Sequence, residues 1–423
     1  MTREAGTGRG RTRVRGLLAT SALVAIAASV LVAGPASADS IRDREYWLST
    51  YGFTTAWNTT KGAGVTIAVI DTGIDGSHPD LAGAVVGGTD VSGVGAANGQ
   101  TPIGDDDEHG TMVASLLAGR GHDGGDGVLG VAPAAKLLSV SVGFGVGSID
   151  SDEQIATAVR WSVDHGANII NMSLTRNTLD WPTSWDDAFL YAMEHNVIVV
   201  AAAGNRGSGT TEVGAPATMP GVVVVAGVDT SGNASFDASS QGITLTVAAP
   251  SEGLVGAAPG GGYYQWAGTS GATPIVAGLL ALIESAHPGL SAGNVINRLT
   301  ATATKKGDSI IYGSGLINAA AAVTASVPSV KTDPADDLKN WIRLNRRAVA
   351  SAAPQASISS TPTPKASNIA VAAPVSPFGR VLPTMSSLRD VGVPLLVFII
   401  FAAALGFMGW RARRESKRRE TKL

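Results

Sequence analysis

The 423-residue sequence contains no cysteine. Disulfide bonds, thiolate nucleophiles and cysteine-based zinc sites are therefore excluded. Charged residues make up only 15% of the chain and aromatic residues 5%, whereas there are 53 glycines. Abundant glycine together with alanine indicates tight turns and close packing of helices on a sheet. The length suffices for one large domain with appended segments.

The formal net charge of −3 hides an uneven distribution. Residues 1–15 carry five arginines and one glutamate, and residues 411–423 carry seven basic and two acidic residues. Setting both ends aside leaves 19 basic and 31 acidic residues. This acidic balance argues against a nucleic-acid partner.

The first 38 residues have the pattern of a secretory signal peptide. A basic start is followed by an apolar core over residues 17–33 and by the small-residue site Ala36-Ser37-Ala38. We expect cleavage after Ala38, and the alternative is an uncleaved signal anchor. The basic region has no adjacent pair of arginines, which favours the general secretory route.

A second apolar segment lies near the other end of the chain. Residues 391–410 include no charged side chain, and twenty helical residues span about 30 Å, the thickness of a bilayer core. A buried core helix would have the same composition, but the basic flank at 411–423 follows the positive-inside pattern. The sequence therefore predicts a transmembrane helix over 390–410 and a cytoplasmic tail over 411–423. The expected location is the cell membrane, with a single pass and the bulk of the chain outside the cytoplasm.

Between these ends, apolar strand patterns alternate with helical ones, which predicts an α/β domain with a mostly parallel sheet over residues 39–327. Ser151 and Gln154 have the spacing of a helix capping box. Residues 328–389 are rich in Ala, Pro and Ser and are expected to be a linker, with a short helix over 338–349. The expected strands are 65–70, 136–142, 169–174, 197–203 and 222–228. The expected helices are 112–118, 151–165, 185–195, 270–287 and 294–299, after a short helical lead-in at 41–57.

Three polar residues stand at the ends of these elements. Asp71 ends a strand, while His109 and Ser270 each begin a helix. Strand carboxyl ends and helix amino ends share one edge of a parallel sheet, so these distant residues can converge there. An isolated serine at this place would be an ordinary helix cap. With a histidine and an aspartate beside it, Ser270 is a candidate nucleophile, His109 its base and Asp71 the group that orients His109.

Two further residues bear on this candidate site. Asp75 competes with Asp71, but Asp71 directly terminates the apolar strand and is preferred. Asn205 follows a buried strand and a glycine, and its amide can donate to an oxyanion together with the backbone N–H of Ser270.

The sequence around these residues resembles the subtilisin-like serine proteases, or subtilases. Four blocks occur in the family's order Asp, His, Ser; they are Val-Ile-Asp-Thr-Gly-Ile at 69–74, His-Gly-Thr-Met-Val-Ala at 109–114, Ala-Gly-Asn at 203–205 and Gly-Thr-Ser-Gly-Ala-Thr-Pro at 268–274. The resemblance implies a three-layer subtilisin-like fold and serine endopeptidase activity that requires no cofactor. It also implies a substrate strand with Ser173 and Leu174, and a specificity pocket walled by Ala203 and Gly204.

The order of segments along the chain is similar to that of the mycosins, the membrane-anchored subtilases of type VII secretion systems. That likeness implies exported protein substrates and a secretion membrane complex as partner. A mainly structural role in such a complex and a housekeeping surface protease are the alternatives. Many subtilases have His and Met where this chain has Met112 and Gly271, so altered packing is expected there. Because few residues separate Ala38 from the lead-in, we expect no folding prodomain.

The acidic run at residues 105–108 directly precedes His109. It is explained most simply as a solvated loop. Alternatively, it attracts basic substrate residues or raises the pKa of His109. Its oxygens would also suit a structural Ca²⁺, although no EF-hand spacing is present and no metal is assigned. His78, close to Asp71, is expected to belong to a structural turn.

Overall fold

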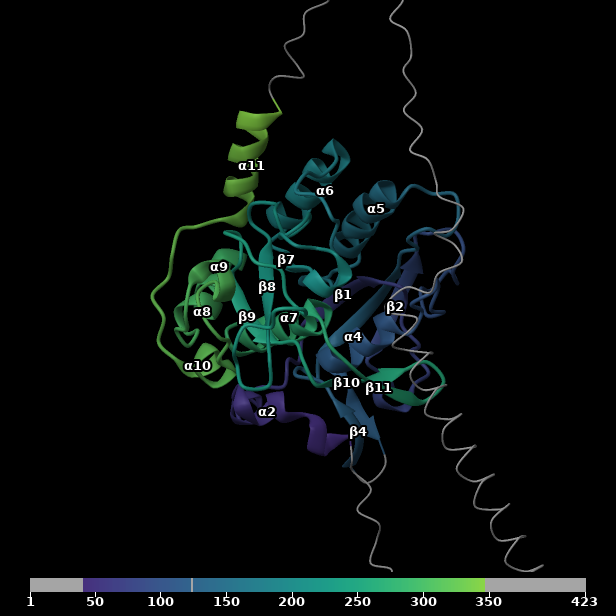
Figure 1. Ribbon diagram of the computed structural model, residues 1–423, viewed down its shortest axis with the longest axis vertical. Coiled ribbons are helices and arrows are strands. Elements are labelled where there is room, and N and C mark those ends of the chain that lie inside the picture. The colour runs from purple at the N-terminus through teal and green to yellow at the C-terminus, as the bar shows by residue number, and fades with distance from the viewer. Residues whose placement is uncertain (1–40, 123–124, 347–423) are drawn as a thin grey trace, which may run out of the picture. The chain divides into compact units, whose positions relative to one another are not determined.

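A computed structural model describes residues 41–122 and 125–346. Seven strands form a central sheet in the order β2-β5-β1-β6-β7-β8-β9, and every neighbouring pair is parallel. Helices α4 and α7 pack together on one side, while α5 and α6 pack together on the other (Figure 1). The strands are β1 Thr66–Asp71, β2 Val85–Asp90, β5 Lys136–Ser141, β6 Ile169–Met172, β7 Ile198–Ala202, β8 Val223–Val228 and β9 Val247–Pro250. The helices of the two outer layers are α4 His109–Ala118, α5 Ser151–Asp164, α6 Thr183–Glu194 and α7 Thr269–Ala286. The predicted three-layer α/β fold is thus confirmed.

Smaller elements surround these layers. The lead-in forms η1, α2 and α3, and antiparallel strands form two hairpins, β3–β4 and β10–β11. Their bounds are η1 Arg42–Arg44, α2 Tyr46–Thr50, α3 Phe53–Ala56, η2 Pro79–Leu81, β3 Arg120–His122, β4 Asp126–Leu129, η4 Arg206–Ser208, β10 Leu254–Ala258 and β11 Gly262–Trp266. The remaining helices are α8 Ala292–Ala301, α9 Ser309–Tyr312, α10 Ala319–Thr324 and α11 Pro334–Asn345.

The five predicted strands are all present, because long β-branched runs match strands that are buried on both faces. Strand β6 ends at Met172 and is therefore shorter than the predicted 169–174, which leaves Ser173 and Leu174 beyond the strand. Strands β2 and β9 were not predicted. The first has a Gly-Gly pair and the second a proline, and both residue types weaken a strand pattern.

The predicted capping box at the start of α5 is wrong. Asp150 is the N-cap, and its carboxylate accepts a hydrogen bond from Asp152 N at 2.9 Å. The Gln154 side chain instead accepts from Gly143 N at 2.8 Å and donates to the carbonyl oxygens of Gly143 and Ile149. Gln154 therefore holds the loop that follows β5, because that loop offers backbone groups that need partners.

Helix α7 runs through the middle of the domain and contacts β6, β7, β8 and β9. It is the one described helix that is long and apolar enough to cross a membrane, but 78% of its apolar window is buried within the domain. It is therefore the core helix of the fold. The predicted signal peptide (1–38), transmembrane helix (390–410) and tail (411–423) lie outside the described residues.

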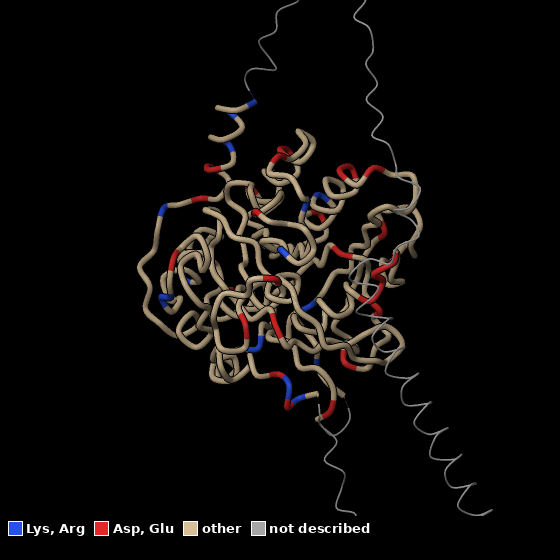
Figure 2. The backbone as a smooth tube through the Cα atoms, viewed as in Figure 1, with Lys and Arg blue, Asp and Glu red and all other residues tan. Residues whose placement is uncertain are grey.

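The start of the predicted linker requires a correction. Helix α11 begins at Pro334, not at residue 338, and it packs on α6. The rings of Trp181 and Trp341 lie 4.2 Å apart between centroids, and Arg346 pairs with Asp186 at 2.7 Å. The acidic first turn and the later basic residues of α11 complement its helix dipole (Figure 2). Residues 334–345 thus belong to the packed domain, because they bury an apolar face.

This packing predicts a difference between two truncated chains. A chain that ends at residue 327 should melt about 5 °C or more below a chain that ends at residue 346, because it loses the burial of Leu338 and the tryptophan contact. Thermal unfolding followed by circular dichroism measures the difference. Equal melting temperatures would show that α11 contributes nothing to stability.

Candidate active site

Asp71 and His109 meet where β1 ends and α4 begins. The distance from His109 Nδ1 to Asp71 Oδ1 is 2.7 Å. Asp71 is buried, whereas the His109 side chain is 24% exposed and can meet a substrate. Thr72 N donates to the same carboxylate oxygen at 2.8 Å, and this hydrogen bond fixes its orientation. The pair therefore holds the imidazole with Nδ1 toward the carboxylate and leaves Nε2 for other chemistry.

Two opposing effects act on the pKa of His109. Burial lowers the pKa, but the charge and hydrogen bond of Asp71 raise it, and Asp106 and Glu108 add to the rise. The net result is a pKa above the usual histidine value. The acidic run before α4 therefore acts on His109, as one of the sequence interpretations proposed, although Asp105, Asp106 and Asp107 are exposed.

Ser270 is the second residue of α7. Its Oγ donates to the carbonyl oxygen of Ser173 at 3.1 Å, and no described hydrogen bond joins it to His109. In return, Ser173 Oγ donates to the carbonyl oxygen of Ser270 at 2.8 Å. Free active sites often show such loose geometry between nucleophile and base. The sequence did not reveal this reciprocal contact between Ser173 and Ser270.

Asn205 lies beside the residues that precede Ser270. Its Oδ1 accepts hydrogen bonds from Thr269 N at 2.8 Å and Thr269 Oγ1 at 2.9 Å. Because both bonds use the oxygen, the amide nitrogen Nδ2 remains a free donor among the described residues. A Cβ at Gly268 would lie 3.0 Å from Nδ2, and Gly268 has φ +146°, so a side chain there would be both crowded and strained. Thr269 orients the Asn205 side chain, because its N–H and its hydroxyl both bind Asn205 Oδ1. The sequence analysis did not identify this role of Thr269.

Asp75, the competitor of Asp71, has different partners. Its carboxylate accepts hydrogen bonds from Ser77 N and from Gly260 N, each at 3.0 Å. Burial raises the pKa of Asp75, but these hydrogen bonds and that of the Ser77 hydroxyl outweigh it and hold the pKa below its usual value. Asp75 thus ties a turn to the β10–β11 hairpin, whereas Asp71 contacts His109.

The predicted substrate-binding residues lie at three places. Leu174 lines a cavity of about 370 Å³ together with Phe144, Trp185 and Arg176. Arg176 forms an ion pair with Asp152 and lies 5.5 Å from the centroid of the Trp185 ring. Ala203 is buried and directly follows β7, and Gly204 N donates to Thr269 Oγ1 at 3.1 Å.

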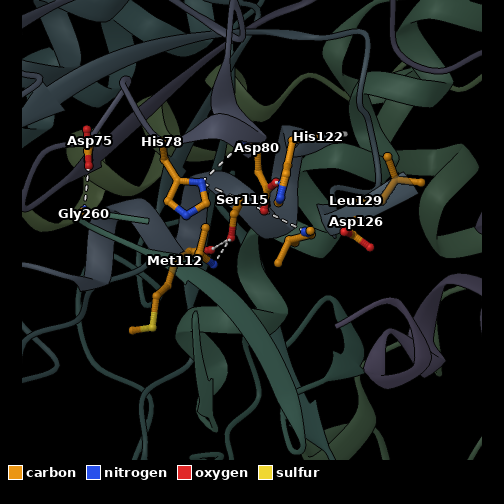
Figure 3. Close-up of polar contacts among 12 residues, drawn as sticks. Asp75, His78, Asp80, Met112, Ser115, His122, Asp126, Leu129 and Gly260 are labelled. Atoms are coloured by element: carbon orange, nitrogen blue, oxygen red, sulfur yellow. Dashed lines mark hydrogen bonds and ion pairs between the residues drawn. The ribbon is translucent and has the colours of Figure 1, made fainter. Parts of the chain in front are cut away.

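Further histidines and acidic groups stabilise the fold near this site. His78 is buried, and its Nδ1 accepts a hydrogen bond from Asp80 N at 3.1 Å, in line with the predicted structural turn (Figure 3). Asp80 in turn pairs with His122 at 2.6 Å. Within residues 41–122 and 125–346, no group of three or more His, Asp or Glu side chains could hold a metal ion.

Comparisons with known proteins show the family to which the chain belongs. A family model described as the subtilase family matches residues 62–315. Subtilisin DY of Bacillus licheniformis is 42% identical over 265 residues, which cover 62% of this chain and 92% of the relative. The MycP3 protease from the type VII (ESX-3) secretion system superposes with a TM-score of 0.57 and 31% identity, over 67% of this chain and 88% of that one. Fervidolysin from Fervidobacterium pennivorans, a keratinolytic enzyme, superposes with a TM-score of 0.59 and 30% identity. The match covers 68% of this chain and 48% of fervidolysin.

Proposed function

Because the chain belongs to the subtilase family and is a serine endopeptidase, we propose that Asp71, His109 and Ser270 are its catalytic triad. The observation that carries this assignment is the 2.7 Å contact between His109 Nδ1 and Asp71 Oδ1 at one edge of the sheet. Asp75, the other candidate carboxylate, binds a backbone N–H of the β10–β11 hairpin instead.

In the proposed reaction, Ser270 Oγ turns from the Ser173 carbonyl toward His109 and attacks the scissile carbonyl carbon. His109 Nε2 takes the hydroxyl proton, and Asp71 stabilises the imidazolium that forms. The negative oxygen of the tetrahedral intermediate accepts hydrogen bonds from Asn205 Nδ2 and the Ser270 backbone N–H. His109 then gives its proton to the leaving amine, an acyl-enzyme remains, and water hydrolyses it by the reverse sequence of proton transfers.

The segment after β6 is the proposed binding edge for substrate. Strand β6 ends at Met172, so Ser173 and Leu174 have backbone groups that an extended peptide can pair with by adding a strand. The cavity beside Leu174 would take a side chain of that peptide, and Arg176 and Asp152 at its wall would favour a polar or long one. Ala203 and Gly204 would wall the pocket for the residue before the scissile bond.

We further propose that the enzyme is anchored in the cytoplasmic membrane by residues 390–410 and acts outside the cytoplasm on exported proteins. The support is the signal-peptide pattern of residues 1–38, the apolar segment with its basic flank and the likeness to MycP3. The same likeness supports a type VII secretion membrane complex as its partner.

Covalent labelling tests the catalytic assignment. Full-length protein, purified with detergent present, should react with a fluorophosphonate probe, and mass spectrometry should find the adduct on Ser270. Boiled protein is the control for non-specific labelling. Folded protein that stays unlabelled, or an adduct on another residue, would contradict the proposed triad.

A structural role in a secretion complex is the second candidate function, because the MycP3 protease, which this chain resembles, comes from the type VII (ESX-3) secretion system. A strain with the Ser270→Ala variant separates it from the proteolytic role. If secretion depends on proteolysis, the variant should fail as a full deletion does. Secretion that persists in the variant but fails in the deletion would assign the essential role to the scaffold.

The raised pKa of His109 predicts the pH dependence of the reaction. Only neutral His109 can accept the serine proton, so kcat/KM should fall as the pH drops through a midpoint above the usual histidine pKa. The double variant Asp106→Asn, Glu108→Gln removes two charges that raise this pKa and should move the midpoint to lower pH. The pH–rate profile measures the midpoint.

The neighbouring carboxylates provide the matched control for this experiment. Asp105→Asn, Asp107→Asn removes the same amount of charge from the same run but spares the two groups that act on His109. Equal shifts in both double variants would show that only the net charge of the run matters.

A further inference from the structure

We propose that Trp266 is a positioning residue for His109, and that the β10–β11 hairpin sets the place of His109 relative to the Ser270 helix. This inference rests on the proposed triad, and it concerns a residue outside the four sequence blocks. Trp266 is the last residue of β11 and lies four positions before Ser270.

Trp266 contacts both sides of the candidate site. Its ring meets the His109 imidazole edge to face, with 5.7 Å between centroids and an interplanar angle of 78°. Two carbons of the same indole ring lie 3.3 and 3.4 Å from the position that a Cβ on Gly271 would take. The indole therefore borders His109 and the first turn of α7 at the same time.

The absence of a side chain at residue 271 leaves room for the indole and for Leu254 beside the first turn of α7. A Cβ there would also lie 2.3 Å from Leu254 Cδ1, and Leu254 is the cross-strand neighbour of Trp266. Gly271 thus lets the base of the hairpin pack directly on the turn that carries Ser270. The packing at residue 271, where many subtilases have methionine, therefore involves Leu254 and Trp266 of the hairpin.

Several contacts fasten the hairpin to α4, the helix that begins with His109. Ala257 N donates to Ser115 Oγ at 2.9 Å, and a Cβ on Gly256 would lie 2.9 Å from Met112 Cβ, so β10 lies directly on α4. Figure 3 shows Met112 and Ser115 near His78, whose ring meets Tyr263 of β11 edge to face at 5.5 Å. At the hairpin turn, Gly260 N donates to Asp75.

Because the hairpin is held against α4, Trp266 can restrain the orientation of the His109 ring. Asp71 orients His109 by one hydrogen bond at Nδ1, so a second contact on the ring adds a further restraint on its position. An aromatic wall on the ring restricts that motion and keeps water from one side of the imidazole. The indole Nε1 is buried and has no hydrogen-bond partner among the described residues, so packing and not hydrogen bonding is the source of the effect.

The test uses three variants of full-length protein. Trp266→Leu keeps an apolar side chain, so the protein should still fold, but it removes the aromatic ring beside His109. This variant should lower kcat about tenfold with a much smaller change in KM. Because water then reaches His109 and relieves the burial that lowers its pKa, the acid limb of the kcat/KM profile should move to higher pH. Trp266→Phe keeps an aromatic ring and should restore most of the rate.

The matched control is Tyr264→Ala, which removes an aromatic residue from the same strand at a position that is 55% exposed. It should leave both kcat and the pH profile unchanged. If Trp266→Leu has the wild-type pH midpoint, or loses no more rate than Tyr264→Ala, the positioning role is overturned. The positioning role is also overturned if Trp266→Phe is as slow as Trp266→Leu.

Fluorophosphonate labelling keeps this result separate from the triad assignment. Wild-type protein that is not labelled at Ser270 contradicts the triad, and the Trp266 proposal fails with it. Wild-type protein that is labelled, with Trp266→Leu labelled equally fast, contradicts the role of Trp266 alone. Slower labelling of the leucine variant, with rescue by phenylalanine, supports both.

Discussion

Replacement of Ser270 by alanine is expected to reduce kcat about 10⁶-fold, a magnitude known from a subtilisin relative in which nucleophile and base act as a unit. The reason is that alanine leaves no hydroxyl at the place of the proposed nucleophile, and the neighbouring Thr269 hydroxyl is already bonded to Asn205 Oδ1 and Gly204 N. The loss should appear in kcat with little change in KM, because the serine acts on the transition state. Hydrolysis of a peptide substrate by wild-type and variant proteins measures it.

The same variant should remain folded. The Ser270 hydroxyl makes one hydrogen bond, to Ser173 O, and losing one such bond costs about 1 kcal/mol. A melting temperature near that of the wild type would therefore accompany the lost activity. A variant that keeps a hundredth of the wild-type rate, with contaminating protease excluded by affinity repurification, would refute the assignment of the nucleophile.

Replacement of Asn205 by aspartate is expected to lower kcat by about 10²–10³-fold or more, the cost of one oxyanion donor in a subtilisin relative. Aspartate keeps the acceptor oxygen that Thr269 N and Oγ1 bind, so the loop before Ser270 should stay in place. It replaces the donor Nδ2 by a second oxygen, which repels the developing negative charge. The loss should be in kcat, with only a small change in melting temperature.

Asn205→Ala is the companion variant for this experiment. It removes the donor and also leaves Thr269 N and Oγ1 without their acceptor, so it should lose stability as well as rate. Aspartate and alanine variants with the same melting temperature would contradict the second role of Asn205. An aspartate variant with the wild-type rate would exclude Asn205 as an oxyanion donor.

The parts of the fold that could be predicted were those with strong local patterns. Residues 65–70 and 197–203 are nearly continuous β-branched or alanine runs, and both became strands of the parallel sheet. The β10–β11 hairpin was missed, although Gly260 and Gly261 between two strand-length segments are a hairpin signal. The role of Gln154 could not be predicted, because Gln154 lies in α5 and its partner Gly143 lies in the loop after β5.

Some residues of the candidate site could likewise be predicted from the sequence, and others could not. Asp71, His109 and Ser270 could be singled out because element ends in a parallel sheet share one edge, and because their order matches that of the subtilases. The choice between Asp71 and Asp75 rested on which residue ends the strand; Asp71 contacts His109, whereas Asp75 binds Gly260 N. Thr269 and Trp266 were not singled out, because their importance lies in contacts with residues distant in the chain or across a turn.

The sequence by itself determined the class of the molecule: an α/β serine protease domain between two apolar terminal segments, with the types of residue that its chemistry needs. Local composition sets strand and helix formation and supplies a hydroxyl, an imidazole and a carboxylate in a known order. Only the tertiary structure decided how these groups are held. The Oδ1 of Asn205 is taken by Thr269, the indole of Trp266 lies against His109, and α11 packs on α6. The reason is physical: orientation depends on contacts between segments that only folding brings within hydrogen-bonding or van der Waals distance.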